Sequence, residues 1–128
     1  MNKGLRMASL AAIGLYWLML CVLTHLPVSP RKPWHMGDST AHFLAFIGLS
    51  ALLYLHLWVT RPGFRWNATV VLALAMLYAL VDERTQPLVG RTCDIMDWMA
   101  DVAGAAAGVT AMGVIHWGVS LRRGKTGG

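Results

Sequence analysis

Four long apolar stretches divide this sequence, and they constrain the fold more than any other feature. They run over residues 7–26, 40–59, 66–82 and 95–119. A helix needs about 20 apolar residues to cross the hydrocarbon core of a bilayer, and it must satisfy its backbone hydrogen bonds internally there. The third stretch is short for a full span. The sequence therefore predicts an all-α membrane protein, with four transmembrane helices in an antiparallel bundle that forms one domain over residues 1–128.

The composition agrees with an integral membrane protein. Of the 128 residues 56% are apolar and only 13% are charged, which is unusual for a soluble domain. The net charge of +5 does not indicate a nucleic-acid partner, because the basic residues stand singly or in pairs beside the apolar stretches. We predict the lipid bilayer as partner and no nucleic acid, and association into homo-oligomers stays open.

The positions of the basic residues predict the orientation in the membrane. With a cytoplasmic N-terminus the inner side carries Lys3, Arg6, Arg61, Arg65, Arg122, Arg123 and Lys125, and the outer side carries Arg31, Lys32, Arg84 and Arg91. The positive-inside rule favours this arrangement. We therefore expect an inner-membrane protein with both termini in the cytoplasm and all acidic residues on the outer side. The glycine-rich tail, from about residue 122 to 128, is expected to be disordered.

Five of the six carboxylates lie in one polar stretch, residues 82–104. Charge beside a membrane is costly unless it is paired or solvated, so this cluster is a hypothesis for a functional site. A spacing of three and four residues places three carboxylates on one face of the fourth helix: Asp94, Asp97 and Asp101. Gly104 and Gly108 continue that face with small residues that let a neighbouring helix pack closely. The acids are therefore predicted to point into the bundle.

The start of the second helix adds two polar residues, Asp38 and His42, which share a face by their four-residue spacing. In the predicted topology this start meets the polar stretch at the outer side. We expect one acidic pocket there, with His42, Glu83 and Asp97 as candidate catalytic residues. Its candidate binding residues are Asp38, Gln86, Arg91, Asp94 and Asp101.

Three interpretations of the pocket stay open. It is a structural network of paired charges, with a hydrogen bond from His42 to Asp38; or it is a divalent-cation site, in which His42, Asp97 and Asp101 are the ligands. In the third, His42 or Glu83 acts as a base and Arg91 binds an anion. Whether the protein is an enzyme is therefore left open, and a divalent cation is the one cofactor that these residues suggest.

Taken in order, these motifs resemble the VanZ-like family of small bacterial membrane proteins. The family pattern opens one helix with Asp-Lys-x-x-His-Phe, continues with Asp-Glu-x-x-Gln and Gly-Arg, and opens the last helix with Asp-x-x-x-Asn-x-x-Gly. Here the segments read Asp38-Ser-Thr-Ala-His42-Phe43, Asp82-Glu83-Arg-Thr-Gln86, Gly90-Arg91 and Asp97-Trp-Met-Ala-Asp101-Val-Ala-Gly104. Ser39 stands in place of the lysine and Asp101 in place of the asparagine, so this pocket is more acidic than the family pattern.

The resemblance implies a multi-pass protein of the cell envelope. The family's namesake is associated with resistance to the glycopeptide teicoplanin, so an effect on glycopeptide susceptibility is implied as well. We expect the pocket to bind or modify a lipid or cell-wall precursor headgroup. A metal-dependent membrane hydrolase or transferase that uses His42, Glu83, Asp97 and Asp101 is the first alternative, and a structural or assembly partner without catalysis is the second.

Overall fold

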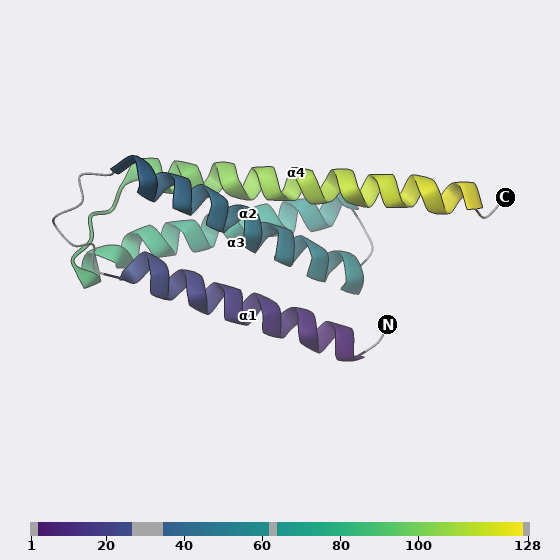
Figure 1. Cartoon of the computed structure of the whole chain (residues 1–128), viewed down its shortest axis with the longest axis horizontal. Coiled ribbons are helices and arrows are strands. Elements are labelled where there is room, and N and C mark those ends of the chain that lie inside the picture. The colour runs from purple at the N-terminus through teal and green to yellow at the C-terminus, as the bar shows by residue number, and fades with distance from the viewer. Residues whose placement is uncertain (1–2, 27–34, 62–63, 127–128) are drawn as a thin grey trace.

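The computed structural model describes residues 3–26, 35–61 and 64–126, and these residues are almost entirely helical (Figure 1). The elements are α1 (Lys3–His25), α2 (His35–Thr60), α3 (Phe64–Thr85), the short 3₁₀ helix η1 (Gln86–Val89) and α4 (Ile95–Thr126). The four α-helices are long and apolar enough to cross a membrane. The predicted all-α fold with four transmembrane helices is thereby confirmed.

The helices run antiparallel in chain order, so the start of α1 and the end of α4 lie at the same end of the bundle (Figure 1). The opposite end holds η1 and the start of α4, and we call it the loop end. α2 packs most extensively against α4, and α3 packs against both. α1 lies on the outside of the bundle, and few of its side chains are buried. The loop end is therefore where four helix ends and the polar stretch come together.

Every helix except the last begins earlier than its apolar stretch, and α4 ends later. α2 begins at His35 rather than near residue 40, and α4 continues to Thr126, so the expected disordered tail is helical as far as the structure describes it. No proline interrupts residues 95–126. Arginine is a good helix former, and its charge is favourable near a helix C-terminus, so Arg122 and Arg123 extend α4.

Glycines allow α4 to lie directly against the backbone of α2. A Cβ atom on Gly104 would collide with the carbonyl oxygen of Phe43, and one on Gly108 would collide with Ser50 Oγ and the carbonyl oxygen of Ile47. Both glycines are buried. The close α2–α4 contact therefore depends on the missing side chains, as small residues allow in membrane helix pairs.

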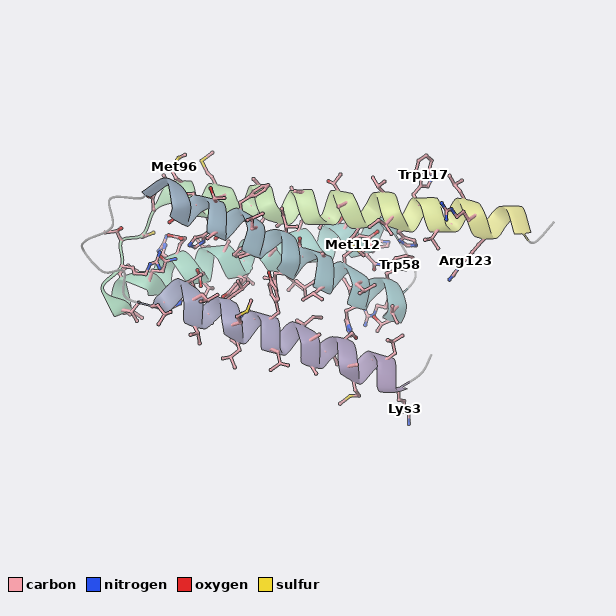
Figure 2. The ribbon with its side chains drawn as sticks, in the orientation of Figure 1. Lys3, Trp58, Met96, Met112, Trp117 and Arg123 are labelled. Carbon is pink, nitrogen blue, oxygen red and sulfur yellow. The ribbon has the colours of Figure 1, made fainter. Side chains whose placement is uncertain are left out.

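The outer surface of the bundle is apolar. Met96 and Trp117 are 59% and 65% exposed, and both point away from the bundle (Figure 2). Large apolar side chains are also exposed along α1 and α3. Such a surface is costly in water and suits the hydrocarbon of a bilayer. The buried side chains include Phe46, Tyr54 and several alanines, and the polar residues among them mark the site described next.

Candidate functional site

A buried pair between α2 and α4 is the centre of the site. His42 Nδ1 lies 2.9 Å from Asp101 Oδ1, and the two side chains are 3% and 0% exposed. Asp101 lies one helical turn before Gly104, where α4 approaches the backbone of α2 most closely. Close packing of the two helices thus brings the histidine and the carboxylate into contact and excludes water from them.

Glu83 reaches the same place from the end of α3. One ligand atom from each of His42, Glu83 and Asp101 lies within 4.8 Å of the other two, and all three residues are buried. Glu83 Oε2 accepts a hydrogen bond from the backbone N–H of Asp94 at 2.9 Å, and Oε1 accepts one from Gln86 Nε2 at 3.0 Å. The Glu83 carboxylate is therefore fixed by the chain segment that connects α3 to α4.

The 3₁₀ helix η1 gives that segment its shape. Its first residue, Gln86, is fully buried, and Pro87 suits the first turn because it lacks an N–H group. Gly90 ends η1 with a φ angle of 80°, a left-handed conformation that glycine adopts without a steric penalty. The N–H of Arg91 then donates to the carbonyl oxygen of Gln86 at 3.2 Å. This turn reverses the direction of the chain and brings the backbone N–H of Asp94 to the carboxylate of Glu83.

A further buried carboxylate, Asp82, connects α1 to the site. Asp82 Oδ1 accepts hydrogen bonds from Thr24 Oγ1 at 2.8 Å and from Tyr78 Oη at 3.3 Å, and Oδ2 accepts one from Gln86 Nε2 at 3.3 Å. His25 Nδ1 lies 3.8 Å from Asp82 Oδ1. The Gln86 amide group thus joins Asp82 to Glu83. Sequence reasoning missed Thr24 and His25, since a hydroxyl and a histidine at the end of an apolar helix carry no distinctive spacing.

The other predicted residues lie near the central group in different roles. Asp97 Oδ1 accepts a hydrogen bond from Ser39 Oγ at 2.5 Å, and the group of potential ligands contains Glu83 where we had predicted Asp97. Asp94 is exposed, and its Oδ1 accepts from the N–H of Met96 at the start of α4. Arg91 is half-buried beside η1. Asp38 belongs to α2, but its side chain lies outside the described part of the chain.

His42 Nδ1 contacts Asp101 Oδ1, and the expected bond from His42 to Asp38 stays a prediction, because the side chain of Asp38 lies outside the described part of the chain. Asp101 is the acidic residue that departs from the VanZ-like pattern, and it is the one that meets the histidine. The additional carboxylate is therefore fully buried, in contact with the histidine.

Three buried polar atoms at this end have no hydrogen-bond partner among the residues that the structure describes: Gln86 Oε1, Trp98 Nε1 and Asp101 Oδ2. Two are acceptors and one is a donor. A buried polar group without a partner costs about 1–3 kcal/mol, so native proteins rarely leave several together. Two of them, Gln86 Oε1 and Asp101 Oδ2, belong to residues in or beside the group of His42, Glu83 and Asp101.

Polar contacts at the opposite end of the bundle are simpler. Ser9 Oγ lies 2.8 Å from His56 Nδ1, and Tyr54 Oη lies 3.2 Å from His116 Nδ1. The ring of Trp58 stacks on His116 with centroids 4.4 Å apart. These pairs join α1 to α2 and α2 to α4, and they contain no carboxylate. We interpret them as contacts that hold the helices together.

The model of the VanZ/LLP1 family matches residues 18–116, which is more than half of the chain. This chain belongs to the VanZ/LLP1 family. The resemblance predicted from the motifs is thereby confirmed, and the protein is a VanZ-like multi-pass membrane protein. The matched region of this VanZ/LLP1 protein includes His42, Glu83 and Asp101. No curated protein sequence and no solved structure matches the chain at a significant level.

Proposed function

We propose that this protein binds the polar headgroup of a lipid, or of a lipid-linked cell-wall precursor, in the acidic site at the loop end. One observation carries the proposal: a buried polar group with unpartnered atoms lies at the end of a bundle whose outside is apolar. An amphiphile has the complementary arrangement, because its tail can lie on the apolar helices while its headgroup enters the polar site. The chemistry shared by both ligand classes is a phosphate-bearing headgroup.

The residues around the site support a route for such a headgroup. Asp94 is exposed, while its backbone N–H contacts the buried Glu83, so the chain around Asp94 leads from the surface to the site. Arg91 lies beside the same turn, and a guanidinium group binds phosphate in a two-pronged geometry. In this proposal Arg91 contacts the phosphate and the buried acids hold the more deeply placed part of the ligand.

The loop end is proposed to face the outside of the cell, in the inner membrane, with both termini in the cytoplasm. The native Cys93 is exposed at this end, while Cys21 is partly buried in α1. In a Cys21→Ser variant, a membrane-impermeant maleimide is therefore expected to label Cys93 on intact spheroplasts. Labelling that requires permeabilised membranes would contradict the orientation.

Lipid retention tests the proposed function. An Arg–phosphate hydrogen bond contributes about 1.5–3 kcal/mol, so Arg91→Ala is expected to weaken headgroup binding by about tenfold or more. The protein is purified in a mild detergent, and native mass spectrometry measures the fraction of chains that retain a phospholipid or a lipid-linked precursor. The mass of the retained molecule identifies which of the two it is.

Arg84→Ala is the matched control, because Arg84 is an exposed arginine at the same end of the bundle. It is expected to retain the lipid as the unmodified protein does. Equal retention in the unmodified protein and Arg91→Ala would contradict the role of Arg91. Unmodified protein that retains no headgroup-bearing molecule would contradict the proposed function itself.

A further inference from the structure

We infer that the site holds a divalent metal ion, such as Mn²⁺ or Zn²⁺, bound by His42, Glu83 and Asp101. The inference deepens the proposed function and rests on it for the role of the ion, which is to present a positive charge to the headgroup phosphate. The assignment of the ligands rests on the structure alone. The sequence predicts His42, Asp97 and Asp101 as ligands, whereas the structure brings Glu83 to the group and places Asp97 against Ser39.

The geometry is close to that of a coordination sphere. Ligands at about 2.1 Å from a metal, set at right angles, lie about 3.0 Å from each other. The His42 and Asp101 atoms are 2.9 Å apart, and the three ligand atoms lie within 4.8 Å of one another. Three ligand atoms this close can share one metal centre after a small adjustment of the side chains. Imidazole with two carboxylates is a donor set that suits Mn²⁺, Fe²⁺ or Zn²⁺.

The unpartnered atoms are an independent indication of a ligand. Asp101 is fully buried, its Oδ1 contacts His42, and its Oδ2 has no hydrogen-bond partner in the described part of the chain. Gln86 is also fully buried, and its amide lies against Glu83 through Nε2 while its Oε1 is unpartnered. Two oxygen acceptors beside the cluster thus lack a donor. A cation satisfies oxygen atoms of this kind, whereas an added anion or another acceptor does not.

The charge of the cluster points the same way. Asp82, Glu83 and Asp101 are each at most 2% exposed. Gln86 joins Asp82 to Glu83, and Glu83 and Asp101 each offer an oxygen atom within 4.8 Å of the other. Buried carboxylates are costly unless a positive charge compensates them. A divalent ion supplies that charge, and it adds a second positive charge, besides that of Arg91, that attracts a phosphate.

Hydrogen bonds from neighbouring groups hold the proposed ligand Glu83. Asp94 N–H and Gln86 Nε2 bind the two oxygens of Glu83, each of which keeps a further lone pair for a metal. In metal sites such outer contacts orient the ligands and raise their affinity. The remaining coordination positions would be open to water or to phosphate oxygens, as catalytic and substrate-binding metal sites require.

Metal binding is measured directly on the full-length protein in detergent. After treatment with a chelator and desalting, Mn²⁺ is titrated and followed by electron paramagnetic resonance, and Zn²⁺ is tested by competition. We expect about one Mn²⁺ per chain. We expect Asp101→Asn and Glu83→Gln each to weaken binding by more than the roughly 10–100-fold that outer contacts cost. His56→Gln, at the opposite end of the bundle, is the control and is expected to bind as the unmodified protein does.

Titration of the unmodified protein with Mn²⁺ and Zn²⁺ tests the metal site even if a variant fails to fold. Unmodified protein that binds neither Mn²⁺ nor Zn²⁺ would overturn it, and so would full affinity in a folded Asp101→Asn variant. Absence of metal together with Arg91-dependent lipid retention would remove this inference and leave the proposed function standing. Metal binding without any lipid retention would support this site and remove the proposed function.

Discussion

Replacing His42 with leucine is expected to lower the free energy of unfolding by about 3–5 kcal/mol, because it leaves the Asp101 carboxylate buried without its partner. The pair is 3% and 0% exposed and joins α2 to α4, the most extensive helix contact in the bundle. The measurement is unfolding in mixed micelles as the denaturing detergent increases, with chelator present so that metal binding does not contribute.

The double variant His42→Leu/Asp101→Leu provides the control. Hydrophobic residues of similar volume often replace a buried ion pair at little cost, so the double variant is expected to recover most of the lost stability. It should nevertheless bind no Mn²⁺. A stable fold without the binding site would separate the structural role of the pair from its functional one. A loss below about 1 kcal/mol in His42→Leu would contradict the buried pair.

Gly104→Ala is expected to destabilise the protein by about 1–3 kcal/mol or more, as overpacking of a close contact does. The added methyl group would meet the carbonyl oxygen of Phe43, a backbone atom that cannot turn away as a side chain can. The α2–α4 contact must then widen, and this moves His42 away from Asp101. Thermal unfolding and Mn²⁺ affinity should therefore fall together.

Gly118→Ala is the matched control on the same helix. A Cβ atom at Gly118 meets no described heavy atom within 4 Å, and alanine is a better helix former than glycine by up to about 1 kcal/mol. Gly118→Ala should therefore be neutral or slightly stabilising. Equal stability of Gly104→Ala and Gly118→Ala would show that α4 does not approach α2 as closely as described.

The helices were predictable because a membrane span needs a long apolar run, and the sequence contains four. Their ends were less predictable, since polar residues such as Arg122 and Arg123 prolong a helix beyond the hydrocarbon. The face shared by Asp97 and Asp101 follows from helical spacing. Spacing alone does not show which neighbour each acid meets, and here Asp97 meets Ser39 whereas Asp101 meets His42.

The contacts of Glu83 depend on the conformation of the turn after α3, which the sequence indicates only in part. Pro87 and Gly90 mark a break after α3, but the hydrogen bond from Asp94 N–H to Glu83 depends on the full path of η1. The hydrogen bonds of Asp82 were likewise not predictable from the sequence, because they join segments distant in sequence through Thr24 and Gln86. Local patterns predict elements and faces, while contacts between distant elements come from the fold.

Photo-crosslinking shows whether a headgroup enters the site of His42, Glu83 and Asp101. The protein is reconstituted with a phospholipid that carries a photoreactive group beside its phosphate, and the crosslinked residues are mapped by peptide mass spectrometry. We expect crosslinks in residues 39–43 and 83–101, at the loop end, and their loss on competition with unlabelled lipid. Crosslinks confined to the opposite end, or spread evenly along the apolar faces of the helices, would show that the headgroup does not enter this site.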